Sequence, residues 1–179
     1  MKLDRLILIL ALVSLSGCSS MQISDFENRT PKLTLEEYFE GRTWAWGIFE
    51  DRFGNLRREF AVDIDGRWDG ETLTLDEHFR YSDGETERRV WNIEALGDGR
   101  YLGRADDIIG HADGVAVGNA LRWQYRMKLK VGDGTWNVSF DDWMFLQRDG
   151  VMINRAEVSR WGLTIGTVTL FFSKQGPES

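Results

Sequence analysis

The sequence of 179 residues contains little cysteine, proline or histidine. Its single cysteine, Cys18, excludes a disulfide within the chain. The two histidines, His78 and His111, are not at the spacing of zinc ligands, so no metal site is expected. The two prolines, Pro31 and Pro177, leave a long middle stretch without the residue that interrupts β-ladders. That stretch is therefore compatible with long, continuous strand pairing.

Recognisable motifs of cofactor and nucleophile chemistry are also missing. The sequence has no Gly-x-Ser-x-Gly elbow, no phosphate-binding loop and no dinucleotide fingerprint, so we expect no cofactor. Basic side chains are outnumbered, 22 against 29 acidic ones, which gives a net charge of −7. A chain with this charge has no electrostatic reason to bind nucleic acid.

The N-terminus has the layout of a bacterial secretory signal. Two basic residues precede an apolar run, Leu6–Val13, which is too short to cross a bilayer. The following "LSGC" resembles the lipobox of lipoproteins, in which the cysteine is lipidated after the signal is removed. We therefore expect a signal peptide over residues 1–17 and lipidation at Cys18, the alternative being an ordinary signal with an incidental cysteine. Ser19 in place of aspartate points to an outer-membrane lipoprotein whose domain faces the periplasm.

The remaining chain suits one domain. Residues 18–33 contain the cysteine and a polar stretch without a sustained period, and we expect a tether there. Thr34 and Glu37 fit a capping box and predict a short helix near residues 34–40. The predicted domain spans residues 34–174, and residues 175–179 form a tail.

A period of two, punctuated by turn signals, follows the predicted helix. Asp-Gly pairs recur along the chain, and Asp-Gly is among the strongest hairpin signals. The predicted strands alternate well, as in "LRWQYRMKLKV", whose apolar residues share one face. We count nine or ten strands. The glycine-rich segment "GHADGVAVGNA" reads instead as a flexible hairpin or portal loop.

Strands that alternate apolar and polar residues and are joined by hairpin turns indicate an antiparallel sheet with one apolar face. An up-and-down β-barrel, as in lipocalins and other calycins, would bury one face and hide the sheet edges. A two-sheet β-sandwich is the alternative. The densely charged polar faces argue against a barrel that spans a membrane. We expect a monomer.

Several segments together resemble one family. In order they are "FEG…W.WGIFEDRFG", "GRWDGETLTLDEHFRYSDGE", "RRVWNI", "GNALRWQY", "DDWMFL" and "NRAEVSRWG". This order resembles the uncharacterised proteobacterial lipoproteins of domain of unknown function 3833 (DUF3833). The resemblance supports lipoprotein status and a single domain, and it implies no activity.

Charged residues on apolar faces are the candidate site. Glu77 shares a face with Leu73 and Phe79, and Asp142 shares one with Trp136 and Met144. On the next predicted strand, Arg155 shares a face with Val151 and Ile153. If these faces line one interior, Glu77 and Asp142 lie inside with Arg155 as a partner. The aromatic wall of such an interior would include Trp44, Trp46, Trp123 and Tyr125.

Three interpretations of the acids remain open. A bulge at Asp141-Asp142 would return one acid to solvent. A buried ion pair between Asp142 and Arg155 would be structural. In the third, the acids and Arg155 form the polar anchor of a ligand cavity, where Arg155 holds a carboxylate or phosphate.

Three function classes follow. The first is a binding module that holds a hydrophobic ligand, such as a fatty acid or lipid, inside the barrel and is attached to the membrane by its lipid anchor. The second is an enzyme acting on a lipid, with Glu77 or Asp142 as acid or base; it ranks lower because no nucleophile is paired with a base. The third is a structural role in the cell envelope.

Overall fold

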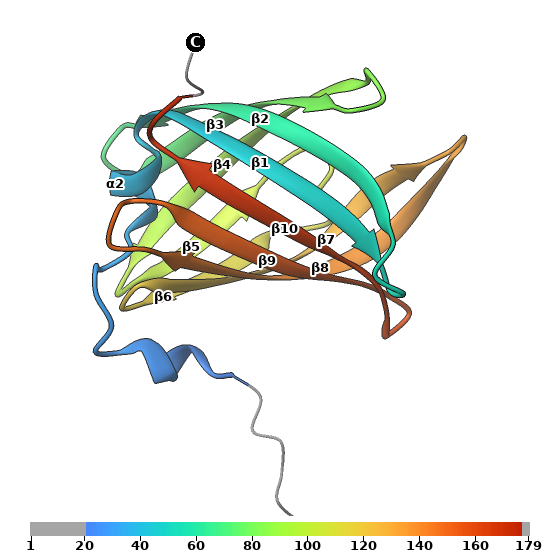
Figure 1. The fold of residues 1–179 in the computed structure, drawn as a ribbon. Helices are drawn as coiled ribbons and strands as arrows, with labels where there is room; N and C mark the ends of the chain where they lie inside the picture. Colours follow the sequence, from blue (N-terminus) through green and yellow to red (C-terminus); the bar gives the residue numbers. More distant parts are fainter. Residues whose placement is uncertain (1–20, 177–179) are drawn as a thin grey trace, which may run out of the picture.

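The computed structural model describes residues 21–176, so the predicted signal, Cys18 and the end of the tail lie outside the described residues. Ten antiparallel strands close into one barrel, seen from the side in Figure 1. The strands are β1 (Gly41–Asp51), β2 (Leu56–Trp68), β3 (Thr72–Tyr81), β4 (Thr86–Gly97), β5 (Arg100–Arg104), β6 (Ala112–Val117), β7 (Ala120–Val131), β8 (Gly134–Leu146), β9 (Met152–Arg160) and β10 (Leu163–Ser173).

The strands follow one another around the barrel in chain order, and β1 closes it by pairing with β10. The predicted up-and-down antiparallel barrel is confirmed, and the sandwich alternative is wrong. The glycine-rich segment expected as a flexible hairpin or portal loop contains β6 and the turn into β7, so it forms a hairpin and the portal-loop alternative is wrong.

Two of the Asp-Gly pairs, Asp65-Gly66 and Asp113-Gly114, lie inside strands and form no turn. Their glycines allow close packing. A Cβ at Gly66 in β2 would lie 1.8 Å from the carbonyl oxygen of Phe39. A Cβ at Gly114 in β6 would lie 2.2 Å from the ring of Trp123. At these two positions the missing side chain lets a helix residue and an interior tryptophan approach the sheet.

A short helix, α2 (Leu35–Phe39), lies across one end of the barrel (Figure 1). Its side chains Leu35, Tyr38 and Phe39 are buried, and the Tyr101 hydroxyl accepts a hydrogen bond from the backbone N–H of Leu35. The helix begins after Thr34, as expected, although the Thr34 hydroxyl donates to the Glu37 carboxylate, at 2.7 Å, instead of capping the backbone. The helix therefore closes one end of the barrel interior.

The segment before α2, expected to be part of a tether, packs against the barrel where it is described. The 3-10 helix η2 (Ile23–Phe26) brings the Phe26 ring to 6.1 Å from Trp143 and 5.6 Å from Phe145, both on the outer face of β8. Leu33 is buried, and its N–H donates to the carbonyl of Gly118 at 2.8 Å. This cover explains why large aromatic residues alternate with the interior ones along β8.

The described part of the chain has the features of an independent domain. Within residues 21–176 every strand has two neighbours, so these strands leave no open sheet edge. The buried apolar side chains of the strands and of α2 form one hydrophobic core. Among the same residues, no helix has the length and apolar character needed to cross a bilayer. We therefore expect residues 21–176 to fold on their own.

Candidate functional site

The two acids of β8 face opposite sides of the barrel wall. The ladder between β7 and β8 is continuous, with Asp141 opposite Gln124 and Asp142 opposite Trp123, so the proposed bulge is wrong. Asp142 is buried, with 6% of its surface exposed. Asp141 points outward and accepts hydrogen bonds from the Arg122 guanidinium at 2.8 and 2.6 Å. The apolar even register of β8 therefore carries Asp142 into the interior.

Arg155 does not lie inside the barrel, so its predicted pairing with Asp142 is wrong. It is exposed on the outer face of β9, opposite Trp143. The interior residues of β9 have the other parity: Met152, Asn154, Ala156 and Val158. Both faces of this strand carry apolar residues, so alternation alone left its register ambiguous.

Trp44 and Trp46 are also on the outer face, which corrects the prediction that they line the cavity. Trp46 is 41% exposed and pairs with Phe171 across to β10. The interior of β1 is made of small residues at this level: a Cβ at Gly47 would lie 2.5 Å from the Phe60 ring. Gly47 leaves room for the Phe60 ring inside the barrel, whereas the large side chains of Trp44 and Trp46 lie on the outer face.

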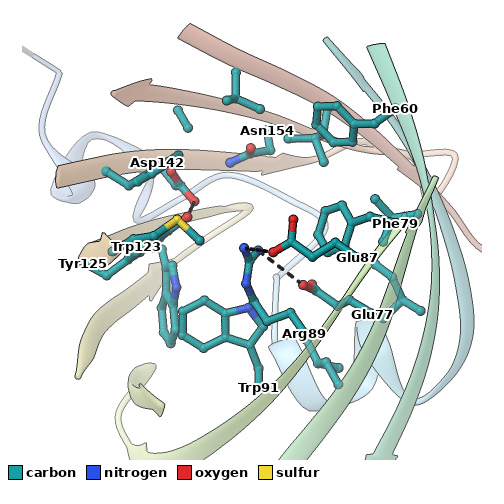
Figure 2. Close-up of a pocket in the computed structure, with 18 of the residues that line it drawn as sticks. Phe60, Glu77, Phe79, Glu87, Arg89, Trp91, Trp123, Tyr125, Asp142 and Asn154 are labelled. Carbon is teal, nitrogen blue, oxygen red and sulfur yellow. Dashed lines mark hydrogen bonds and ion pairs between the residues drawn. The ribbon is translucent and has the colours of Figure 1, made fainter. Parts of the chain in front are cut away.

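A cavity of about 370 Å³ lies inside the barrel. One end of the cavity is lined by Leu35 and Phe39 of α2. The opposite end of the barrel is open, and the cavity is lined there by Arg58 of β2 and by Lys130 and Val131 of β7. Most of the lining is apolar and aromatic. Four of the residues predicted for the site line it: Glu77, Trp123, Tyr125 and Asp142. Figure 2 shows them around the interior.

Arg89 on β4 is a cation that lines the cavity away from its open end. It lies directly across the ladder from Glu77, with 3.8 Å between guanidinium nitrogen and carboxylate oxygen. Its guanidinium also donates to Asp107 at 2.9 Å and to Glu87 at 3.4 Å. Figure 2 shows Glu77 and Glu87 beside Arg89. Three carboxylates therefore surround one guanidinium. Arg89 shares its register with Trp91 and Ile93, and this alternation could have identified it from the sequence.

Glu77 is held in an environment that disfavours its charge. Its side chain is only 13% exposed, and 3.8 Å is long for an ion pair with Arg89. Burial raises the pKa of Glu77 to about 7, and the positive charge of Arg89 opposes this shift only in part. Glu77 can therefore gain or lose its proton near neutral pH.

The charged form of Asp142 is stabilised less by its neighbours than that of Glu77 is. The Asp142 Oδ2 accepts a long hydrogen bond, 3.4 Å, from the Tyr125 hydroxyl, whose ring stacks on Phe140 at 4.9 Å. Its Oδ1 is buried and has no hydrogen-bond partner among the described residues. Burial raises the pKa of Asp142 to about 8, although the Tyr125 hydrogen bond opposes the shift. A neutral carboxylic acid with one unsatisfied oxygen therefore faces the cavity.

The chemistry of the cavity follows from this set of groups. Three acids and three cations line the cavity. Arg89 lies among the acids, whereas Arg58 and Lys130 lie at the open end. The pKa values of Glu77 and Asp142 are raised to near neutral pH. The described lining contains no serine, cysteine or histidine side chain. Within residues 21–176, no three His, Cys, Asp or Glu residues are placed to hold a metal ion. The cavity can bind an apolar body, accept hydrogen bonds and exchange protons.

Comparison with known proteins gives one result about family and none about activity. The model of a family described as a protein of unknown function (DUF3833) matches residues 12–174. No curated protein matches the chain.

Proposed function

Because the chain belongs to the DUF3833 family, whose function is unknown, we propose from the site alone that the protein binds an amphipathic small molecule inside its barrel. The polar group of this molecule donates hydrogen bonds, as an amine or a hydroxyl does. The observation that carries the proposal is Asp142, a buried carboxyl that faces an apolar cavity with one oxygen unsatisfied.

Size and lining support a ligand for the cavity. Small-molecule sites in proteins occupy about 300–1,000 Å³ and combine apolar walls with a few polar groups. The cavity of about 370 Å³ has that character, with aromatic rings such as Trp91, Trp123 and Phe140 around it. A buried polar atom without a partner destabilises a fold by about 1–3 kcal/mol. A ligand that donates to Asp142 Oδ1 would remove this penalty.

Charge favours a donor over a carboxylate as the ligand's polar group. A fatty-acid carboxylate would find two guanidinium groups in the lining, and both are already paired. Arg89 contacts Glu77, Glu87 and Asp107. Arg58, at the open end, contacts Asp83 and Glu85. The carboxylate would also add negative charge beside Glu77 and Asp142. An amine would instead favour ionisation of these two acids, and a hydroxyl could donate to either of them.

Acid–base catalysis on a bound lipid is the second candidate. Glu77 and Asp142, with pKa values of about 7 and about 8, titrate in the range that suits proton transfer at neutral pH. Binding ranks first because the cavity lining supplies no serine, cysteine or histidine beside these acids.

Attachment to a membrane is part of the proposal. The "LSGC" segment would make Cys18 the lipidated first residue of an outer-membrane lipoprotein that faces the periplasm. Several acyl chains on one cysteine would hold the protein stably at the bilayer. The barrel would then bind its ligand close to the membrane that supplies or receives it.

The test compares ligands that share one alkyl chain. The sample is the trimmed chain, which lacks residues 1–17 and carries Cys18→Ser. Dodecylamine, dodecanol and dodecanoate compete with the uncharged fluorescent probe N-phenyl-naphthylamine. We expect the amine and the alcohol to displace the probe at about tenfold lower concentration than the carboxylate, a difference of about 1.4 kcal/mol. Amine affinity should rise between pH 6 and pH 9, as Glu77 and Asp142 ionise.

A pair of variants on β10 shows whether binding is inside the barrel. Val168→Trp places a large ring in the cavity, whereas Thr169→Trp places it on the outer face of the same strand. Only Val168→Trp should abolish displacement. The proposal fails if no alkyl compound displaces the probe, or if both variants bind as the parent does. Preferred binding of dodecanoate would overturn the choice of polar group.

A further inference from the structure

The open end of the barrel has large apolar side chains at its hairpin tips, and they form a patch distinct from the cavity. The turns β1–β2 and β9–β10 lie side by side at the end opposite α2, as Figure 1 shows. A hydrogen bond of 3.0 Å from the Arg52 N–H to the Ile165 carbonyl joins them. Their tips carry the most exposed apolar residues of the described chain: Phe53 at 75%, Leu56 at 55%, Trp161 at 85% and Leu163 at 63%. We call these four residues the rim.

Trp161 occupies a backbone position that does not suit it. Its φ of 54° lies in the left-handed region, where a bulky side chain is an outlier and glycine or asparagine is favoured. With 85% of its surface exposed, Trp161 gains little packing in return. Folding alone therefore gives no reason for tryptophan at this turn.

Guanidinium groups accompany the aromatic rings of the rim. The Arg52 guanidinium lies 4.8 Å from the centre of the Phe53 ring. Arg160 lies 4.1 Å from the ring of Trp161 and equally close to that of Trp136. The rings of Phe53 and Trp161 therefore each have one arginine beside them, in a chain whose net charge is −7. The β1–β2 turn also carries Asp51, whose carboxylate accepts hydrogen bonds from the backbone of Phe53 and Asn55 within the turn. Aromatic rings beside arginine are typical of side chains at the boundary between lipid headgroups and acyl chains.

We infer that the rim contacts a lipid bilayer containing anionic lipid, with Phe53 and Trp161 entering the acyl boundary and Arg52 and Arg160 meeting the headgroups. The side chains at the two turns stand out into solvent and can enter a bilayer, whereas a protein partner would need a matching hollow. The rim also lies at the open end of the cavity, so contact would place the cavity entrance at the lipid surface. The inference does not depend on which ligand the cavity takes.

The test measures partition of the trimmed chain onto vesicles by co-sedimentation. We expect binding to phosphatidylcholine vesicles containing phosphatidylglycerol, weaker binding to phosphatidylcholine alone, and loss of the difference at high salt. Phe53→Ser and Trp161→Asn should each reduce the partition coefficient by about tenfold, because each removes an aromatic ring from the acyl boundary.

Two comparisons separate a membrane contact from damage to the fold. Trp161→Asn should melt at the same temperature as the parent or higher, because asparagine tolerates the left-handed backbone better. Leu96→Ser removes an exposed apolar side chain of β4 at the other end of the barrel and should leave partition unchanged. The inference is overturned if the parent chain does not bind anionic vesicles, if the rim variants bind as it does, or if Leu96→Ser weakens binding equally. Concentration-dependent self-association that the rim variants abolish, without vesicle binding, would assign the rim to a second copy instead.

Discussion

Replacing Asp142 with asparagine should stabilise the barrel at pH 8 and do so much less at pH 5. Burial raises the pKa of Asp142 in the folded state from 3.8 to about 8. The folded state therefore holds the proton more tightly than the unfolded state does, and stability falls as the pH rises between these two values. Asparagine has a similar shape and carries no charge at either pH, so the variant should lack this loss.

The size of the effect follows from the shift. One pKa unit corresponds to about 1.4 kcal/mol. Over the three pH units between pH 5 and pH 8, the raised pKa of Asp142 therefore lowers the free energy of unfolding of the parent chain by at most about 4 kcal/mol. Water entering from the open end would offset part of this, and we expect about 2 kcal/mol. For a domain of this length, that difference changes the melting temperature by about 4–8 °C.

Thermal melts of the trimmed chain at the two pH values measure this effect. Asp141→Asn is the matched control, because it removes the same charge from the same strand but on the outer face, where Asp141 pairs with Arg122. Its effect on the melting temperature should be the same at both pH values. The reasoning is refuted if Asp142→Asn shifts the melt equally at pH 5 and pH 8, or if it destabilises more at pH 8.

Two further predictions concern Arg89 in the cavity and the N-terminus. Arg89→Met should destabilise the fold by about 3–5 kcal/mol in urea unfolding, because it leaves Glu77, Glu87 and Asp107 without their shared guanidinium. Arg88→Met, which breaks an exposed pair with Asp76, should cost much less stability. Equal losses for the two variants would show that Arg89 is not buried among acids. Cys18→Ser should abolish incorporation of a palmitate analogue in growing cells, and label retained by the variant would exclude lipidation at this residue.

The fold could be predicted from the sequence because its strands are long and most have one apolar face. In β7 the residues Leu121, Trp123 and Met127 share a parity that the structure places inside. The same logic correctly placed Asp142, since its neighbours in the even register of β8 are apolar. The absence of proline between Pro31 and Pro177 agrees with the closed ladder.

Prediction failed where both faces of a strand are apolar or where a small residue replaces a large one. On β9, Ile153 and Val158 have opposite parity, so the sequence could not show that Arg155 faces outward. On β1, the outward tryptophans suggested an interior face, whereas Gly47 and Ala45 mark the true one by being small. The cover of β8 by Phe26 depends on a contact between residues far apart in the chain, which no local pattern reports.

Native mass spectrometry of the trimmed chain is the most direct test of a ligand site inside the barrel. After purification without detergent and addition of dodecylamine, the parent chain and Thr169→Trp should each retain one small molecule. Val168→Trp, whose cavity is filled, should appear at the mass of the chain alone. If all three appear only as the bare chain, or if Val168→Trp retains the amine as the parent does, the barrel does not bind its ligand in this cavity.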